Sequence, residues 1–271
     1  MKKPSIIVVM PAYNAEKTLQ RTIADIPKGF ATRIILVDDA SKDRTKSIGE
    51  KLGLKVYAHQ NNLGYGGNQK TCYWEAMKYP FDAVVMLHPD YQYDATQLPK
   101  LVAPILAGEY DVMIGSRIRT RKEALDGGMP LIKYLLNRFM TTVENMVLGV
   151  NLSEHLSGLR AYSPQTLQTV PFQRFSNDFV FDQQFFISAI SHGLRIGEIP
   201  VPVRYFSEAS SIGYLKGAVF IAETCWYLFL YVLHQTPFFT SSLYRNPRTR
   251  APRPNPKRRV SARQRDSTHS E

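Results

Sequence analysis

Short apolar segments alternate with helix-like segments through the first half of the chain, and this alternation restricts the possible fold most strongly. Apolar residues at helical spacing, such as Leu19, Ile23 and Ile26, lie between the short segments, with Asn14 as the expected N-cap. We therefore predict an α/β fold with a mainly parallel sheet and helices on both faces. The segments rich in Val, Ile and Leu, typical of strands buried on both faces, are residues 6–10, 33–37, 55–58, 83–87 and 111–114.

The second half of the chain combines longer helical patterns with one extended segment. After a polar, loop-like stretch at 117–128, apolar residues at helical spacing predict helices over 131–147, 179–190 and 213–233. The segment 194–203 is expected to be extended around its two prolines. Ligands of open α/β sheets bind beyond the carboxyl ends of the strands, so the polar residues after each strand are the candidate site residues.

Polar residues follow the first two predicted strands. Pro11-Ala12-Tyr13-Asn14 comes after the first, without the GxGxxG sequence of a dinucleotide-binding turn. Its aromatic ring can line a nucleobase, although a helix-capping turn explains the segment equally well. Asp38 and Asp39 follow the second strand. One carboxylate can cap the next helix while the other accepts a hydrogen bond from a base or a ribose hydroxyl, and the alternative is a turn-forming role for both.

His88, Asp90 and Gln92 follow the fourth predicted strand at alternate positions, so they point the same way in an extended segment. One carboxylate, one imidazole and one amide oxygen form an incomplete ligand shell. Such a shell suits Mg²⁺ or Mn²⁺ when substrate phosphates and water complete it. Asp90 is the strongest candidate ligand, whereas His88 taken alone is more typical of an ordinary histidine than of a ligand.

Together these motifs resemble the family 2 inverting glycosyltransferases, and they are most similar to the dolichyl- and polyprenyl-phosphate sugar synthases. Two departures stand out: Ala15 follows Asn14 where the family often has Glu, and His88 replaces the first Asp of the family's metal triplet. The resemblance extends over residues 4–235 and rests on Pro11-Ala12-Tyr13-Asn14, Asp38-Asp39-Ala40-Ser41, His88-Pro89-Asp90-Tyr91-Gln92, Gly115-Ser116-Arg117, Ser157-Gly158-Leu159-Arg160 and the segment from Glu198 to Arg204.

The resemblance implies an A-type glycosyltransferase fold and a nucleoside-diphosphate-sugar donor that carries UDP or GDP. It assigns Pro11, Ala12, Tyr13 and Asn14 to the surface that binds the base, with Asp39 on the base or the ribose.

The same resemblance implies a Mg²⁺ or Mn²⁺ ion on the donor diphosphate. Asp90 and Gln92 would hold the ion, with His88 at the altered position beside it, and the substitution weakens the expectation of a metal. Arg117 and Arg204 would neutralise phosphate oxygens. Negative charge builds on the departing diphosphate as the sugar leaves, so cationic groups aimed at it supply most of the catalysis.

The acceptor decides whether the reaction also needs a base. A lipid monophosphate, with a second pKa of about 6, attacks unaided, whereas a sugar hydroxyl needs a carboxylate to take its proton. Asp182 is the candidate base and Asp178 a poorer one, although either can simply begin a helix. Arg160 binds an acceptor phosphate or braces its loop. The segment 61–68 faces the donor or forms a flexible turn.

We expect inverting transfer to a polyprenyl phosphate. The alternatives are transfer to a hydroxyl of a glycan or a small molecule, and a non-catalytic protein of the same fold that binds nucleotide sugars. Residues 1–212 are predicted to form the catalytic domain, 213–243 an amphipathic helix and 244–271 a disordered basic tail.

The C-terminal part of the chain carries most of the net positive charge. The stretch from Tyr244 to the end holds nine Lys and Arg residues against two acidic ones, which gives +7 of the formal net charge of +11. This charge suits phospholipid headgroups, nucleic acid or no specific partner. No aromatic–basic RNA motif is visible, so specific nucleic-acid binding is not expected. Residues 217–233 include Glu223 and are shorter than a span of about 20 residues, so a helix lying in the membrane interface is favoured over core packing or crossing.

The two cysteines, Cys72 and Cys225, are far apart and provide neither a disulfide framework nor a zinc-binding pair. A reducing compartment is therefore the simpler interpretation. The apolar run near the N-terminus ends at Pro11 and is too short for a signal peptide. We expect a cytoplasmic protein, with peripheral contact at the cytoplasmic face of the membrane.

Overall fold

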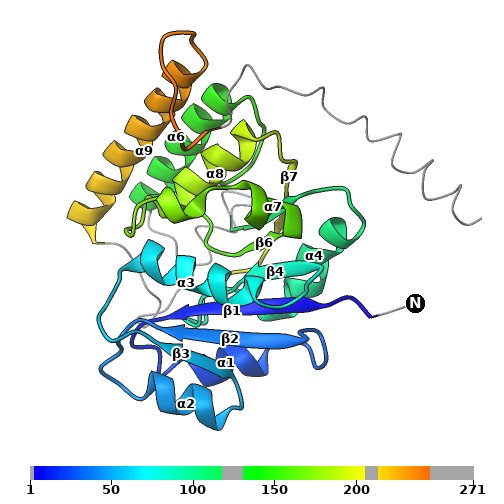
Figure 1. The fold of residues 1–271 in the computed structure, drawn as a ribbon. Coiled ribbons are helices and arrows are strands. Elements are labelled where there is room, and N and C mark those ends of the chain that lie inside the picture. The colour runs from blue at the N-terminus through cyan, green and yellow to red at the C-terminus, as the bar shows by residue number, and fades with distance from the viewer. Residues whose placement is uncertain (1–2, 118–130, 205–212, 245–271) are drawn as a thin grey trace, which may run out of the picture.

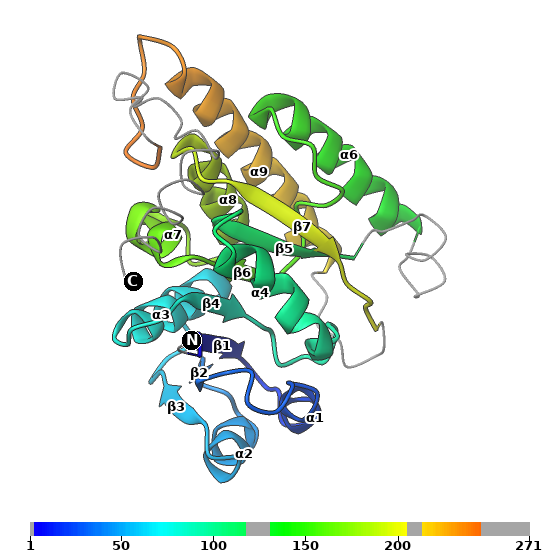
Figure 2. The ribbon, with the colours of Figure 1, turned by 90° about the vertical axis from the view of Figure 1, so that its right-hand side faces the viewer.

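The computed structural model describes residues 3–117, 131–204 and 213–244. In these ranges one seven-stranded sheet has the order β3-β2-β1-β4-β6-β5-β7 (Figures 1 and 2). All neighbouring strands pair in parallel except β6, which is antiparallel to both β4 and β5. The strands are β1 (Ile6–Ala12), β2 (Arg33–Asp38), β3 (Lys55–Ala58), β4 (Ala83–Met86), β5 (Val112–Ser116), β6 (Arg160–Tyr162) and β7 (Ile196–Pro200).

Helices cover both faces of this sheet, as the alternation of apolar segments predicts. The α-helices are α1 (Leu19–Ala24), α2 (Thr45–Lys51), α3 (Tyr65–Met77), α4 (Leu98–Leu106), α6 (Leu131–Leu148), α7 (Pro164–Thr169), α8 (Phe181–Ser191) and α9 (Tyr214–His234). Two 3₁₀ turns, η1 (Ala95–Gln97) and η2 (Phe172–Arg174), precede α4 and α8.

Side chains of β1 alternate between two hydrophobic cores because successive residues of a strand point to opposite faces. Val8 and Met10 belong to the core formed with α1, α2 and α4. Ile7 and Val9 belong to the core formed with α3, α7 and α8. Figure 2, which looks along the sheet, shows α1, α2 and α4 on one side and α3 and α7 on the other. The sheet is therefore buried between two helical layers.

A third cluster joins α6, α8 and α9 at one end of the molecule. Phe186 and Ile187 of α8 pack with Leu148 of α6, Leu228 of α9 and Tyr244, and all five are buried. Helix α9 is long and apolar enough to cross a membrane by length and composition, and only 17% of its window Leu215–His234 is buried. Such a helix is weak evidence for a span, and its buried side faces α8.

The predicted strands are confirmed with small changes of bounds, one local prediction is wrong, and one strand was missed. Helix α1 begins at Leu19 with Thr18 as its N-cap, so Asn14 is not the N-cap. The antiparallel strand β6 was not predicted, because its three residues include a charged Arg160 and form no apolar run. Most of the expected polar loop and residues 245–271 of the expected disordered tail lie outside the described residues. The three-part division of the chain stays a prediction.

Candidate active site

The loops after β1, β2, β4 and β7 lie at the same edge of the sheet because these strands are parallel. In the described part of the chain, the non-glycine residues with positive φ are Asn14 (52°), Ala40 (58°) and Tyr91 (60°). Each lies in one of the first three loops. A positive φ is unfavourable for an L-residue and is found most often where the backbone serves a site. The strained positions therefore mark this edge as the candidate active site.

The loop after β1 is fastened to the loop after β2. Pro11 and Ala12 are buried at the end of the strand, while the ring of Tyr13 is 51% exposed. The amide of Asn14 donates to Ser41 Oγ at 2.8 Å. Its side-chain Oδ1 accepts from the amide of Lys42 at 2.9 Å. Asn14 thus holds two loops together, and Tyr13 presents an aromatic face to solvent at the edge.

The two aspartates after β2 have different partners. Asp38 accepts hydrogen bonds from the amide and the hydroxyl of Ser41, so it stabilises its own turn. Asp39 is buried and accepts from His59 Nδ1 at 2.7 Å and from the amides of Leu63 and Gly64.

Asp39 thereby fixes the segment 61–64 that leads into α3. The prediction of a flexible turn at residues 61–68 did not anticipate these hydrogen bonds to Asp39. Nothing in the sequence pairs an aspartate with amides more than 20 residues later.

Tyr65 brings the loop after β4 to the start of α8. Its hydroxyl donates to Asp182 Oδ2 at 2.7 Å and lies 3.3 Å from His88 Nε2. Its ring stacks on the imidazole of His88, with 5.4 Å between centroids and 5° between planes. Burial lowers the pKa of His88, against the opposing effect of Asp90 and Asp182. Sequence reasoning missed Tyr65, and an aromatic residue in a glycine-rich stretch was the available signal.

Asp182 is a buried carboxylate whose two oxygens are both engaged. Oδ2 accepts from Tyr65, and Oδ1 accepts from Gln69 Nε2 at 3.0 Å. The guanidinium of Arg160 lies 3.7 Å from Oδ1. Asp178 is exposed and accepts from the amide of Phe179, so it shapes the approach to α8.

Arg160 is almost completely buried and acts as a brace. It donates to the carbonyl oxygens of Ser157, Asp182 and His155. Burial opposes its charge, but Asp182 and neighbouring tyrosines raise its pKa above the usual range. These contacts favour the bracing role over direct binding of an acceptor phosphate.

The segment after β7 pairs with the segment that carries Asp90. The amide of Gln92 donates to Asp90 Oδ1 at 3.1 Å, and Tyr93 forms an isolated antiparallel bridge with Val203. The guanidinium of Arg204 lies 4.4 Å from the centre of the Tyr91 ring. It also donates to Asp25 Oδ2 at 3.0 Å.

Asp39, Asp90 and Arg204 are therefore linked around one edge. Asp39 accepts a hydrogen bond from the amide of Gly64, which directly precedes Tyr65. The hydroxyl of Tyr65 contacts His88, which lies two residues before Asp90.

Arg117 is less accessible than the sequence suggests. Its backbone amide and guanidinium both donate to Glu154, and the guanidinium also donates to the carbonyl oxygen of Leu156. Glu154 is fully buried and also accepts from Asn137 of α6. The charge of Arg117 is thus compensated within the protein, and its role at a diphosphate stays a prediction. Glu154 was missed because no spacing rule connects it to Arg117.

A divalent ion at this edge would find one carboxylate ligand. In the described ranges no group of three or more His, Cys, Asp and Glu residues is arranged to hold a metal. Mg²⁺ in nucleotide sites is commonly held by one or two protein carboxylates, with phosphates and water as its other ligands. Asp90, with Gln92 and His88 beside it, fits this donor set when the diphosphate supplies the remaining oxygens.

An α/β sheet with acidic loops gathered at the carboxyl ends of its parallel strands is the arrangement of GT-A glycosyltransferases. The chain belongs to glycosyl transferase family 2, whose family model matches residues 7–167. Membership confirms the predicted enzyme class, and the chain is a glycosyltransferase.

Relatives from archaea cover most of the chain. An uncharacterized protein of Methanocaldococcus jannaschii is 32% identical over 213 residues, which is 79% of this chain and 87% of that protein. The UDP-N-acetylglucosamine–dolichyl-phosphate N-acetylglucosaminyltransferase of Methanococcus voltae is 29% identical over 74% of this chain and 86% of its own length. The dolichyl-phosphate hexose transferase of Haloferax volcanii is 27% identical over 81% of this chain and 91% of its own.

Solved structures confirm the GT-A fold. Glucosyl-3-phosphoglycerate synthase of Mycobacterium tuberculosis matches with a TM-score of 0.66 and 21% identity, over 84% of this chain and 80% of that one. A further structure of the same enzyme, which holds Mn²⁺, UDP and glucosyl-3-phosphoglycerate, matches with a TM-score of 0.63, 20% identity and coverage of 85% and 79%.

Proposed function

We propose that the chain transfers a sugar, with inversion, from a UDP- or GDP-sugar to a polyprenyl phosphate. The observation that carries this proposal is the linked edge on which Asp39, Asp90 and Arg204 lie together. Two of the relatives described above are named as dolichyl-phosphate transferases, which favours a lipid phosphate over a hydroxyl acceptor.

The donor nucleotide would lie across the loops after β1 and β2. The exposed ring of Tyr13 offers a face for the base, next to Pro11 and Ala12. Asn14 holds the two loops together through its hydrogen bonds to Ser41 and Lys42. Asp39 Oδ2 accepts one hydrogen bond from a backbone amide, so its second lone pair can accept one from the base or the ribose.

The diphosphate would lie between Asp90 and Arg204. Mg²⁺ or Mn²⁺ held by Asp90 and Gln92 would supply positive charge to the departing diphosphate. Arg204 adds a guanidinium that lies over the Tyr91 ring, on a side chain that is 41% exposed. Charge-assisted hydrogen bonds from arginine to phosphate are among the stronger polar contacts in proteins. In this arrangement the chain stabilises the leaving group and leaves the attack to the acceptor.

The surroundings of Asp182 support a phosphate acceptor. A general base needs an oxygen that can reach the proton it removes. Asp182 is buried, each of its oxygens already accepts one hydrogen bond from Tyr65 or Gln69, and Arg160 lies beside them, so the carboxylate is engaged in holding its neighbours. A phosphate acceptor is already anionic at neutral pH and needs no such base.

A screen with the full chain tests the proposed function. Purified protein is incubated with UDP- and GDP-sugars, with and without Mn²⁺, and with a polyprenyl phosphate or a free glycan as acceptor. We expect metal-dependent formation of a glycolipid and a released nucleoside diphosphate. Transfer only to the glycan would favour the hydroxyl alternative. Absence of both nucleotide binding and turnover would contradict the proposal.

Asp182→Asn separates the two acceptor classes. The asparagine keeps one oxygen for the Tyr65 hydroxyl but removes the negative charge beside the buried Arg160, so circular dichroism and thermal unfolding of the variant accompany the kinetics. We expect turnover within about tenfold of wild type if the acceptor is a phosphate. A loss of several orders of magnitude with the fold intact would identify Asp182 as the base for a hydroxyl acceptor.

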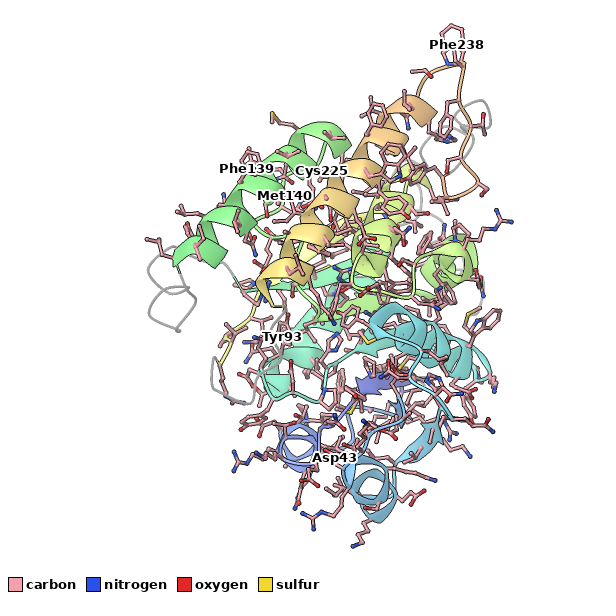
Figure 3. The ribbon with its side chains drawn as sticks, turned by 90° about the vertical axis from the view of Figure 1, so that its left-hand side faces the viewer. Asp43, Tyr93, Phe139, Met140, Cys225 and Phe238 are labelled. Carbon is pink, nitrogen blue, oxygen red and sulfur yellow. The ribbon has the colours of Figure 1, made fainter. Side chains whose placement is uncertain are left out.

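Two helices provide a surface for contact with the membrane. Figure 3 shows α6 and α9 beside each other, with Phe139 and Cys225 labelled on them, and the two helices are in contact. Exposed apolar side chains lie along both helices at helical spacing; they are Leu131, Ile132, Leu135, Leu136, Phe139 and Met146 of α6 and Leu215, Val219, Trp226, Phe229 and Val232 of α9. We call these residues the α6–α9 surface. Clusters of exposed apolar side chains on neighbouring helices are typical of contacts with proteins or membranes.

We commit to a lipid surface as the occupant because of the charge that follows α9. The chain continues from Tyr244 into the stretch that carries +7, and basic segments beside an apolar helix are attracted to anionic lipid. Phe139→Asp and Phe229→Asp should each weaken co-sedimentation with vesicles containing anionic lipid by about tenfold. Leu106→Asp, at an exposed apolar position on α4, is the matched control and should leave binding unchanged. Unchanged vesicle binding of both surface variants would contradict this contact.

A further inference from the structure

The hydroxyl of Tyr65 stands between two candidate site residues. It lies 2.7 Å from Asp182 Oδ2 and 3.3 Å from His88 Nε2. A tyrosine hydroxyl has one proton to donate and can also accept. Only one of these two contacts can therefore receive the proton of Tyr65.

The carboxylate receives this proton. An ionised carboxylate has no proton to donate and can only accept a hydrogen bond. The contact of Tyr65 with Asp182 is also the shorter of the two. The remaining contact then requires His88 to donate through Nε2–H. In a neutral imidazole this leaves the lone pair on Nδ1.

The ring of His88 is also held in place by its surroundings. The Tyr65 ring stacks on the imidazole, and the centroid of the Phe179 ring lies 4.9 Å from the centroid of the Tyr65 ring. A Cβ atom at Gly158 would approach Cδ2 and Nε2 of the imidazole to 3.0 Å. The glycine of the segment 157–160 therefore gives the imidazole room at this edge. The backbone amide of Gly158 is itself fixed by donating to the hydroxyl oxygen of Tyr93 at 2.8 Å.

We propose that Tyr65, anchored on Asp182, is a positioning residue that fixes His88 with its proton on Nε2 and offers Nδ1 to the diphosphate–metal site. The second half of this statement rests on the proposed function. Where the family has a carboxylate, this chain presents one defined nitrogen. Asp182 acts here through Tyr65 and not as a base, which agrees with a phosphate acceptor.

The tautomer is measured without any substrate. Long-range ¹H–¹⁵N correlation spectra of protein labelled at its six histidines report which ring nitrogen carries the proton, and His88→Gln identifies the His88 signals. We expect a single Nε2–H form in wild type. Tyr65→Phe keeps the stacked ring and removes the hydroxyl, so it should yield a mixture of both tautomers. A wild-type Nδ1–H form, or an unchanged tautomer in Tyr65→Phe, would overturn the proposal.

The role at the ligand site is measured by calorimetry with Mn²⁺ and the nucleoside diphosphate, UDP or GDP, that the donor screen selects. Loss of a group that orients a metal ligand weakens metal affinity by about 10- to 100-fold, so Tyr65→Phe should weaken Mn²⁺-dependent binding of this nucleotide by at least tenfold. Tyr244→Phe is the matched control, since this buried tyrosine donates one hydrogen bond to the Tyr227 carbonyl oxygen beside α9. Equal losses in both variants, or none in Tyr65→Phe, would overturn the positioning role. Failure of the sugar transfer itself would leave the tautomer result standing, so the two failures are distinguishable.

Discussion

The backbone amide of Arg204 donates a hydrogen bond to the carbonyl oxygen of Gln92 at 2.9 Å. This contact joins the segment after β7 to the segment after β4, two parts of the chain that are more than 100 residues apart in sequence. It places a guanidinium and a carboxylate, Asp90, on neighbouring stretches of backbone. The candidate diphosphate site depends on this pairing.

Removal of the Arg204 side chain should impair catalysis more than stability. We expect Arg204→Ala to lower kcat/KM for the nucleotide sugar by about 10²- to 10³-fold, because it removes positive charge from the departing diphosphate. Asp25→Asn is the control: it removes the partly exposed partner of Arg204, and it should change the free energy of unfolding by less than about 1 kcal/mol. Steady-state kinetics of both variants check this. A kcat/KM of Arg204→Ala within threefold of wild type would exclude the assigned role.

Asp90 should be required for metal-dependent binding of the nucleotide. Asp90→Asn keeps the shape of the side chain but removes the charge that attracts the ion, so turnover should fall by at least about 100-fold. Calorimetry should then show UDP binding that no longer depends on Mn²⁺. Asp94→Asn is the matched control, since Asp94 caps η1 through the amide of Thr96 and asparagine caps equally well. If both variants retain activity, the ion does not bind at Asp90.

Relief of backbone strain at Ala40 should stabilise the protein. Ala40 has φ of 58°, where a non-glycine residue is destabilised by about 1–2 kcal/mol. Glycine loses more conformational entropy on folding, by about 0.5–1 kcal/mol, so Ala40→Gly should gain up to about 1 kcal/mol. Ala107→Gly, at an ordinary helical conformation (φ −72°), should lose stability instead. Urea unfolding of the two variants checks the opposite signs, and a loss in both would disprove the strain.

A buried pair should make stability fall as the pH rises above neutrality. Glu144 of α6 and His155 are buried with 3.8 Å between carboxylate oxygen and Nδ1. Burial raises the pKa of Glu144 to about 8 and, helped by the charge of Arg160, lowers the pKa of His155 to about 3. Both groups are thus neutral near pH 7, so we describe them as a neutral pair and not as an ion pair.

The sign of the effect follows from the protons bound in each state. Between pH 4.5 and about 8 the folded protein keeps a proton on Glu144 that the unfolded chain has released, so stability falls with increasing pH. His155 acts oppositely from about pH 3 to 6.5, because the unfolded chain is then protonated and the folded protein is not. Between pH 6.5 and 8 only Glu144 contributes, and it lowers the free energy of unfolding by about 2 kcal/mol. Glu144→Gln should remove this fall, as urea unfolding at pH 6.5 and 8.5 would show; an equally steep fall in the variant would argue against it.

The sheet was predictable because its central strands are buried on both faces. Their apolar runs end at polar residues, and those residues are the candidate site residues at the edge. β6 was not predictable, because its buried Arg160 is accommodated by the carbonyl oxygens of His155 and Ser157 in the preceding loop and by Asp182 of α8, which no apolar pattern indicates. Asn14 was misassigned as an N-cap because its hydrogen bonds go to the loop after β2 and not to α1.

The partners of the site residues also could not be predicted from the sequence. Asp39 holds backbone amides near the start of α3, and Arg117 is neutralised by Glu154. These contacts join residues separated by 20 to 40 positions, and hydrophobic periodicity carries no information about them. The resemblance to the family assigned the candidate roles, which stay predictions, whereas only the structure identified Tyr65 as the link between His88 and Asp182.

Because β6 runs opposite to its neighbours, the chain departs from β5 and returns into β6 at the same rim of the sheet. Ser157 Oγ donates to the Gly115 carbonyl oxygen, which closes this excursion at its base. The stretch of chain between β5 and β6, which contains α6, is consequently attached to the sheet at both ends along the same edge. A change in the length of this stretch therefore need not shift the register of any strand of the sheet.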